Sequence, residues 1–363
     1  MPTIGLLRDA RFHDHDTTPN HPERPARLEA IETLLDDSGL SAACVALDAR
    51  PVLEEELLRV HDRTLLDLLI RTDAQIQANK DVDQAARVFL DPDTVMSRHS
   101  WLAAQLAAGG IVDAGRRVAD HDLDGAFCLP RPPGHHATPS QAMGFCLINH
   151  VAIAAADLLA TSRAERIAIV DFDVHHGNGT QDIFYDEARV LYCSTHQFPH
   201  YPGTGLLEET GAGDATGTTL NLPLPESCGD AQYFRCFDEV ILPAVQRFRP
   251  SVVFVSAGFD AHWRDPLAAQ QVSGTGYRGI AERIAASARD LGAGVIYLLE
   301  GGYDLEGIAW AARHCLDVQL GNPAIDDPVG PAPQPGPEIG SLLQRARQIH
   351  GLPELPEPRS AHG

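Results

Sequence analysis

The chain is short of positive charge. Its 363 residues carry 28 Lys and Arg against 50 Asp and Glu, which gives a formal net charge of −22 at pH 7. This balance argues against intrinsic affinity for nucleic acids or anionic membranes, because their surfaces are themselves negative. An acidic surface would attract cationic substrates, but it is equally typical of proteins in which surface charge serves solubility.

Cysteine pairs and long apolar runs are missing as well. The seven cysteines are scattered, odd in number and without a CxxC pair, which fits reduced thiols in the cytoplasm better than a disulfide framework. The sequence has no run of about 18 apolar residues, and residues 1–20 lack the charged start and apolar core of a signal peptide. We therefore expect a soluble cytoplasmic protein.

The remaining composition is that of a folded chain with a large core, since 44% of the residues are hydrophobic and 21% are charged. Short apolar runs rich in β-branched residues predict strands at 4–7, 125–129, 167–170, 190–193, 252–255 and 295–299. Helical spacing of apolar residues predicts helices at 26–35, 57–70, 101–118 and 151–159.

Strands that alternate with helices predict a single α/β domain with three α/β/α layers and a central, mostly parallel sheet. We expect this domain to span residues 1–320. A proline-rich tail with one short helix, at 341–350, would follow it over residues 321–363. Ligands of such sheets bind outside the carboxyl ends of the strands, so the polar segments after the predicted strands are candidate sites.

The segment 171–180, DFDVHHGNGT, follows one of these strands. If extended geometry continues past the strand, Asp171, Asp173 and His175 project to one side. Buried carboxylates beside an imidazole are costly unless a divalent cation neutralises them. Together with Asp260, which follows the strand at 252–255, Asp173 and His175 form a plausible zinc triad with an open fourth position.

Two adjacent histidines, His135 and His136, follow the strand at 125–129 in the proline-rich segment RPPGHHA. In an irregular loop both rings can face one cavity and can supply a general base and a general acid. Each ring then needs a partner that fixes its tautomer, and Asp171 and Asn178 are the candidates.

Tyr303 follows two glycines after the strand at 295–299 and could donate its hydroxyl to the oxyanion of a tetrahedral intermediate. With the metal triad and the histidine pair, it describes metal-assisted amide hydrolysis. The loop at 90–94 could also reach this site. The histidine- and acid-rich segment 13–25 is bounded by prolines, and we interpret it as a solvated rim rather than a second metal site.

These motifs resemble those of the zinc-dependent histone deacetylase family, in the class II branch that includes bacterial deacetylase-like amidohydrolases. The matching blocks are HPERPAR at 21–27, RPPGHHA at 131–137, MGFCLINH at 143–150, DFDVHHGNGTQDIF at 171–184, PGTG at 202–205, SAGFDAHWRDPLA at 256–268 and LEGGYDLEG at 299–307. They occur in the family's order, and the resemblance runs from about residue 21 to about residue 316. It implies the arginase/deacetylase-like fold and makes residues 1–320 the catalytic domain.

The resemblance implies one catalytic zinc ion on Asp173, His175 and Asp260. It also implies a structural potassium ion nearby. The potassium would be held by the main-chain carbonyls of Asp171, Asp173 and His175 and by the Ser194 hydroxyl.

The resemblance also assigns the catalytic roles. His136 is the principal general base, and His135, paired with Asp171, is its electrostatic neighbour. Asn178 stands where class I enzymes carry an aspartate behind the second histidine, so the bond that orients His136 here would be neutral. Tyr303 matches the catalytic tyrosine, which weakly active class IIa members replace with histidine, so we expect an active enzyme.

For the substrate, the resemblance implies a tunnel walled by Phe145 and Tyr201, with the Gly144 carbonyl accepting a hydrogen bond from the substrate amide. Asp93 falls near the rim, where it could orient a peptide backbone or be a solvated loop residue. Leu267 stands where a polyamine-specific relative carries a gatekeeper glutamate, so an apolar residue here removes one reason to prefer a second ammonium group.

The stretch 72–100 is also too short for the insertion with which acetylpolyamine amidohydrolases narrow their entrance, so acylated lysine is the leading substrate. The alternatives are an acetylated polyamine or another small amide, a binuclear manganese ureohydrolase, and a binding protein without activity. The sequence leaves open the acyl-chain length, the physiological substrate and the oligomeric state, with a homo-oligomer as one option.

Overall fold

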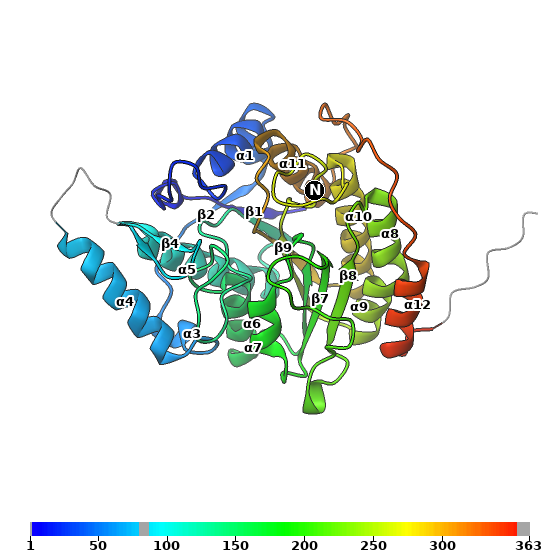
Figure 1. Ribbon diagram of the computed structural model, residues 1–363, viewed down its shortest axis with the longest axis horizontal. Coiled ribbons are helices and arrows are strands. Elements are labelled where there is room, and N and C mark those ends of the chain that lie inside the picture. The colour runs from blue at the N-terminus through cyan, green and yellow to red at the C-terminus, as the bar shows by residue number, and fades with distance from the viewer. Residues whose placement is uncertain (1, 80–86, 354–363) are drawn as a thin grey trace, which may run out of the picture.

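The computed structural model describes residues 2–79 and 87–353. Within these ranges one parallel sheet of eight strands lies between two layers of helices (Figure 1). The strands, in their order across the sheet, are β2 (Val45–Leu47), β1 (Ile4–Leu7), β5 (Gly125–Cys128), β10 (Gly294–Leu299), β9 (Val252–Ala257), β6 (Ile167–Asp171), β7 (Val190–Gln197) and β8 (Thr219–Leu224). A small antiparallel pair, β3 (Val88–Phe89) and β4 (Val95–Met96), lies outside it.

The helices cover both faces of this sheet. One layer contains α5 (Ser100–Ala119) packed on α6 (His150–Ala160), and the other contains α1 (Ala26–Asp37), α11 (Leu305–Leu320) and α10 (Gly274–Leu291). The remaining helical segments are α2 (Leu40–Ala43), α3 (Glu54–Leu57), α4 (Arg63–Ala78), α7 (Asn178–Phe184), α8 (Asp230–Cys236), the π-helical η3 (Phe237–Ile241), α9 (Leu242–Phe248), α12 (Gly340–Ile349) and the 3-10 turns η1 (Ala10–Phe12) and η2 (Gly213–Ala215). No described helix is both long and apolar enough to cross a membrane.

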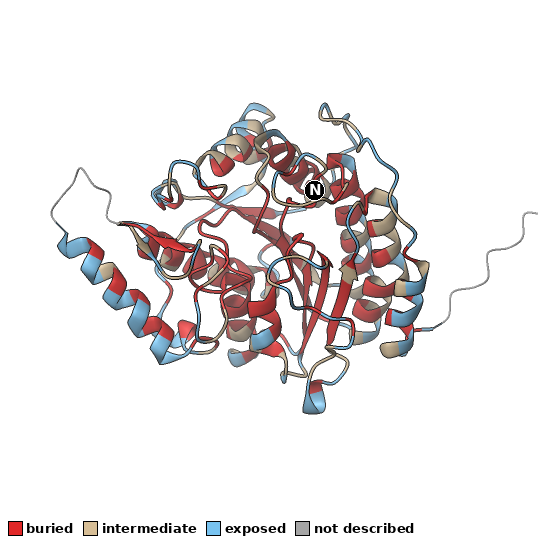
Figure 2. Cartoon of the chain, in the orientation of Figure 1, coloured by how far each residue is buried: buried red, intermediate tan, exposed pale blue. Residues whose placement is uncertain are grey.

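The core lies along the sheet, where nearly every strand residue is buried (Figure 2). Both faces of a parallel sheet are covered by helices, so its strands are continuously apolar rather than alternating. The central strands β6 and β9 follow this rule and are buried at every position. The predicted α/β/α fold is therefore confirmed.

From the sequence, neither the two edge strands nor the helices α10 and α11 were predicted, and one helix was misplaced. β2 is only three residues long, and β8 contains Pro223, which a sheet tolerates at an edge because proline donates no ladder hydrogen bond. The helix expected at 57–70 is wrong, because the chain leaves α3 after Leu57 and α4 begins at Arg63. Between them the Asp62 N–H donates to the Pro139 carbonyl at 2.7 Å, which holds the chain in an extended conformation.

His61, in the same break, supports the segment that carries the histidine pair. Its Nε2 accepts from the Asn149 N–H at 2.9 Å, so Nδ1 carries the proton that is donated to the Thr138 carbonyl at 3.0 Å. Burial lowers the pKa of His61 to about 4, although the carbonyls of Thr138 and Pro139 oppose this shift. The ring is therefore neutral in the folded protein at neutral and mildly acidic pH.

This depressed pKa predicts an acid-sensitive contribution to stability. Between pH 6.5 and pH 4 the unfolded chain binds a proton at His61 that the folded chain excludes, so the free energy of unfolding falls as the pH falls. At pH 5 the loss amounts to about 2 kcal/mol. Urea unfolding at pH 7 and pH 5 should show a smaller loss for His61→Gln than for the unsubstituted protein, and equal losses would contradict the assignment.

Candidate active site

The polar segments that follow β5, β10, β9, β6 and β7 meet at the carboxyl ends of the strands, around a cavity of about 370 Å³. This is the edge of a parallel sheet at which ligands bind. The cavity is lined by His21, Pro22, Asp93, Pro133, His135, His136, Gly144, Phe145, His175, His200, Tyr201, Leu267, Gly301 and Tyr303. Sequence segments far apart in the chain therefore contribute to one pocket.

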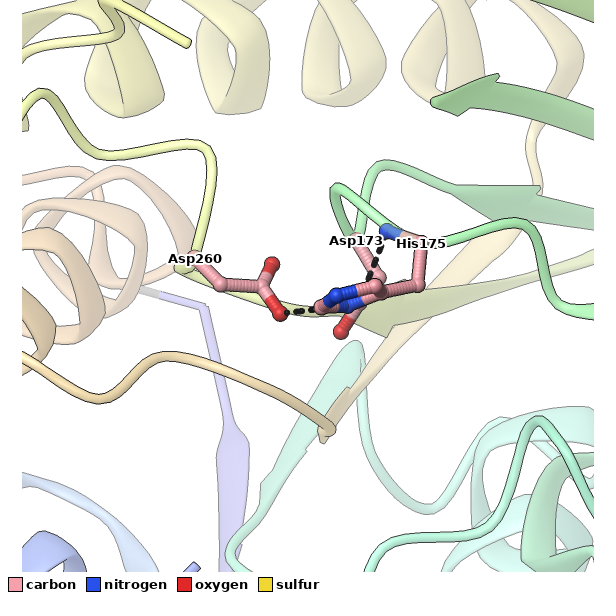
Figure 3. A group of neighbouring side chains, drawn as sticks. All are labelled: Asp173, His175 and Asp260. Carbon is pink, nitrogen blue, oxygen red and sulfur yellow. Dashed lines mark hydrogen bonds and ion pairs between the residues drawn. The ribbon is translucent and has the colours of Figure 1, made fainter. Parts of the chain in front are cut away.

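Asp173, His175 and Asp260 lie together, and His175 also lines the cavity (Figure 3). Their ligand atoms lie within 4.8 Å of one another, and all three residues are buried. His175 Nδ1 is 3.1 Å from Asp173 Oδ1 and 3.1 Å from Asp260 Oδ2. In the described part of the chain this is the one group of three such side chains that could hold a metal ion.

The electrostatics of this group favour a cation. Burial raises the pKa of Asp260, and the neighbouring Asp173 raises it further, because two like charges are held close together away from water. One imidazolium can neutralise only one of the two carboxylates. Oxygen and imidazole donors in this number suit a divalent ion such as zinc.

Two glycines allow the main chain to approach these carboxylates closely. A Cβ atom on Gly258 would lie 1.9 Å from Asp173 Oδ2, and one on Gly301 would lie 2.0 Å from Asp260 Oδ2. The Gly301 N–H donates to Asp173 Oδ2 at 2.8 Å. The glycines in the SAGFD and LEGGYD blocks thus leave room for the carboxylates.

His135 and His136 both line the cavity, with ring centroids 4.0 Å apart. His135 Nδ1 lies 3.1 Å from Asp171 Oδ2, and His136 Nδ1 lies 2.8 Å from Asn178 Oδ1. Both expected pairings are therefore present in the geometry. Since each Nδ1 faces an acceptor oxygen, Nδ1 carries the proton and Nε2 is left for the cavity.

The two rings differ in charge preference. Burial lowers the pKa of His135, but Asp173 and Asp171 outweigh burial and raise that pKa to about 10. Burial lowers the pKa of His136 well below its ordinary value, and the neighbouring His135 and His175 lower it further. One imidazole is thus disposed to hold a proton while the other stays neutral, which is the division that acid/base catalysis requires.

Tyr303 lies across the cavity and is held from behind. The Arg27 guanidinium carbon lies 5.0 Å from the centre of the Tyr303 ring, and Arg27 Nε donates to the Gly302 carbonyl at 2.6 Å. Burial raises the pKa of Tyr303 well above 10, although Arg27 opposes this shift. The phenol therefore keeps its proton and can act as a hydrogen-bond donor.

The residues expected at the tunnel and rim all line the same cavity. The Tyr201 ring lies edge-on to His136 with centroids 5.1 Å apart, and Phe145 faces Tyr303 at 6.1 Å. Asp93, Leu267 and Gly144 also line this cavity. Burial and the adjacent Asp91 raise the pKa of Asp93 to about 6.

Ser194, expected near a potassium ion, pairs with Asp171 in the register between β6 and β7. Its hydroxyl lies 2.9 Å from His196 Nδ1. Residues 80–86 of the stretch 72–100, whose length bears on the substrate, lie outside the described residues.

The expectation that segment 13–25 forms a solvated rim is wrong for its buried residues, although Asp14, Asp16 and Arg24 are exposed. His15 and Glu23 are buried, and His15 Nδ1 lies 2.7 Å from the Ser100 hydroxyl. Glu23 forms ion pairs with two buried arginines, Arg27 and Arg131. Ser100 and Arg131 lie far away in the sequence from His15 and Glu23, and a local pattern cannot reveal such pairs.

Sequence reasoning also missed Glu300, which supports the histidine pair. Its Oε2 accepts from the Gly134 N–H at 2.7 Å and from the His135 N–H at 3.1 Å. Glu300 is buried and fixes the main chain from which the histidines project. The residue belongs to the LEGGYD block, so the motif contained it without indicating its partner.

Comparisons with known proteins point to one family. The family profile described as "Histone deacetylase domain" matches residues 21–319. Histone deacetylase 14, chloroplastic, of Arabidopsis thaliana is 34% identical over 97% of this chain and 88% of its own length. A "Probable deacetylase" of Archaeoglobus fulgidus is 38% identical over 84% of this chain and 82% of its own length.

A solved structure is similar across the whole fold. The crystal structure of the HDA15 HD domain matches with a TM-score of 0.84 and 34% identity, over 96% of this chain and 94% of that one. The profile and the relatives cover the segments that build the cavity. The chain therefore belongs to the histone deacetylase family of metal-dependent amide hydrolases.

Proposed function

We propose that this enzyme removes an acyl group, acetyl foremost, from the ε-amine of acylated lysine in peptides or proteins. The observation that carries the proposal is the convergence on one cavity of the histidine pair, Tyr303 and the buried group formed by Asp173, His175 and Asp260. Base, hydroxyl donor and candidate metal ligands thus surround a space of about 370 Å³. Such a space suits an extended alkyl amide.

We assign the metal ion as zinc, which Asp173, His175 and Asp260 would hold. Two buried carboxylates with one imidazole fit a divalent ion that keeps an open coordination position. When bound there, zinc polarises the substrate carbonyl and lowers the pKa of a water molecule.

The histidines handle the protons. His136 donates Nδ1–H to Asn178, so its Nε2 lone pair accepts the proton of the attacking water and later returns it to the leaving amine. The low pKa of His136 keeps Nε2 free beforehand. His135, anchored on Asp171, holds its proton and stabilises negative charge in the transition state.

Tyr303 and the tunnel residues orient the amide. The Tyr303 hydroxyl donates to the oxygen on which negative charge develops, and its raised pKa keeps the proton in place. Phe145 and Tyr201 exclude water from the alkyl chain, while the Gly144 carbonyl accepts from the substrate N–H. Asp93 and Leu267 contact the part of the substrate that lies outside the tunnel.

A second substrate class, acetylated polyamines, is favoured by the charge of the protein. The formal net charge is −22, and Asp93 at the rim lies beside Asp91. Both features attract a second ammonium group. The manganese ureohydrolase alternative would need a second group of ligands, whereas residues 2–79 and 87–353 provide a single group.

Three further assignments belong to this proposal. A potassium ion would be held by the carbonyls of Asp171, Asp173 and His175 and by the Ser194 hydroxyl. Residues 1–320 would be the catalytic domain, with 321–363 as a tail whose helix α12 packs on β8 and η3. The cytoplasm is the proposed compartment, because all seven cysteines are free.

The proposal is tested by removing and restoring the metal. Dialysis against a strong chelator should abolish hydrolysis of an acetyl-lysine peptide, and one equivalent of zinc per chain should restore it. With zinc bound, kcat/KM for this peptide should exceed that for an acetylated polyamine at the same ionic strength. A preference for the polyamine would move the function to small-molecule deacetylation, and activity that survives chelation would overturn the metal assignment.

A further inference from the structure

Asp265 is a buried carboxylate that does not line the cavity but contacts two residues that do. It lies in the segment between β9 and α10, after the candidate ligand Asp260, and is 7% exposed. Its Oδ2 accepts from the Tyr303 N–H at 2.8 Å, and its Oδ1 accepts from the Leu267 N–H at 2.9 Å. One side chain thus bonds the main chain of a reacting group and of a rim residue.

The Tyr303 segment depends on support of this kind. Gly301 and Gly302 precede the tyrosine, and Gly302 has φ of +114°, a conformation that side chains rarely allow. The two glycines have no side chains that could pack, so hydrogen bonds from neighbouring segments must fix the main-chain position of Tyr303. Arg27 holds the Gly302 carbonyl, and Asp265 holds the Tyr303 N–H.

Both main-chain polar groups of Leu267 make hydrogen bonds. Its N–H donates to Asp265, and its carbonyl accepts from His200 Nε2 at 3.1 Å. The His200 ring stacks on His175, with centroids 5.0 Å apart and an interplanar angle of 29°. A continuous series of contacts therefore runs from Tyr303 through Asp265 and the rim to the candidate metal ligand His175.

We propose that Asp265 is a positioning residue that fixes Tyr303 relative to the Leu267 rim, so that the hydroxyl and the tunnel mouth act on the same bound substrate. This inference rests on the proposed function. Asp265 acts through Tyr303, since it neither lines the cavity nor belongs to the candidate metal group. A displacement of about 1 Å in a catalytic group can lower the rate about 100-fold. The loss of the two Asp265 hydrogen bonds can therefore lower kcat measurably.

The test is a double-mutant cycle on the zinc-loaded enzyme. Asp265→Asn replaces one acceptor oxygen with an N–H donor that faces a main-chain N–H, so kcat should fall by about 10- to 100-fold. In Tyr303→Phe the hydroxyl is already absent. Asp265→Asn should therefore lower kcat far less in that background, since two residues that act as a unit are not additive.

The controls separate positioning from folding. Active enzyme is counted by titration with a tight hydroxamate inhibitor, and zinc per chain is measured, so an unfolded fraction does not lower kcat. Asp230→Asn is the matched control, because Asp230 also accepts from a main-chain N–H, that of Ser273 at 2.8 Å, but lies outside the site. It should leave kcat unchanged.

Two outcomes would overturn the inference. Equal fold-losses from Asp265→Asn with and without the Tyr303 hydroxyl would show an independent effect, and an unchanged kcat would show none. Failure of the proposed function is distinguishable, because the unsubstituted enzyme would then hydrolyse neither the acetyl-lysine peptide nor an acetylated polyamine, and the inference would fall with it.

Discussion

Replacing Tyr303 with phenylalanine is expected to lower kcat by roughly 100- to 1,000-fold, the usual cost of one lost oxyanion donor. The substitution removes one oxygen and leaves the ring. The contacts of the ring with the Arg27 guanidinium and with Phe145 therefore remain, and the cavity keeps its shape. KM and zinc content should change little, because the hydroxyl bonds most strongly to the charge that develops in the transition state.

Tyr201→Phe provides the comparison for this variant. Tyr201 lines the same cavity and also loses a phenol oxygen on substitution, but its assigned part is the tunnel wall. Its kcat should fall much less than that of Tyr303→Phe. Unchanged turnover in Tyr303→Phe, or equal losses in the two variants, would refute the oxyanion role.

The candidate site could be anticipated from the sequence because its residues follow buried strands directly. Asp171, at the end of β6, begins the segment that carries Asp173 and His175, and Asp260 follows β9 in the same way. β6 and β9 pair in parallel, with Asp171 opposite Ser256, so the segments that follow them start side by side. Strand prediction therefore placed the candidate metal ligands at one edge of the sheet, whereas the pairing of β6 with β9 is given by the structure.

The supporting carboxylates could not be anticipated in this way. Glu23, Asp265 and Glu300 bond to groups on other segments. Glu300, for example, accepts a hydrogen bond from the Gly134 N–H, which lies 166 residues away in the sequence. Their sequence neighbourhoods indicate only acidic loop residues. Burial decides their role, because a buried carboxylate must find donors. The tertiary fold supplies these donors from other segments, so the sequence around each carboxylate does not indicate them.

The same reason explains the wrong expectation for segment 13–25. Clustered histidines and acids between prolines are typical of solvated loops. Here Glu23 is buried because Arg131, after β5, supplies the opposite charge, and His15 is buried with its ring against the Ser100 hydroxyl. Hydrophobic periodicity predicts where strands and helices lie, but it does not predict which polar residues are buried together.

Asp260→Asn is expected to separate the catalytic and structural consequences of the metal group. Without this carboxylate a zinc ion would lose one of its three proposed ligands, so metal content should drop. A bound metal supplies several kcal/mol of transition-state stabilisation, so its loss corresponds to a fall in kcat of about 1,000-fold or more. Zinc at 1,000 times its Kd should also raise the free energy of unfolding of the unsubstituted protein by about 4 kcal/mol, and with it the thermal midpoint. The variant should not respond.

In the metal-free proteins the expected effect has the opposite sign. Asp173 and Asp260 are both fully buried and repel each other, which together with burial raises the pKa of Asp260. The neutral amide removes that repulsion, and its oxygen can still accept from the Val174 N–H, as Asp260 Oδ1 does at 2.8 Å. The metal-free variant should therefore be at least as stable as the metal-free parent in urea at pH 7, while Asp230→Asn should retain the full zinc response. A variant that binds zinc as tightly as the parent would show that Asp260 is not a ligand, whereas a strongly destabilised metal-free variant would show that the carboxylate serves the fold before it serves the metal.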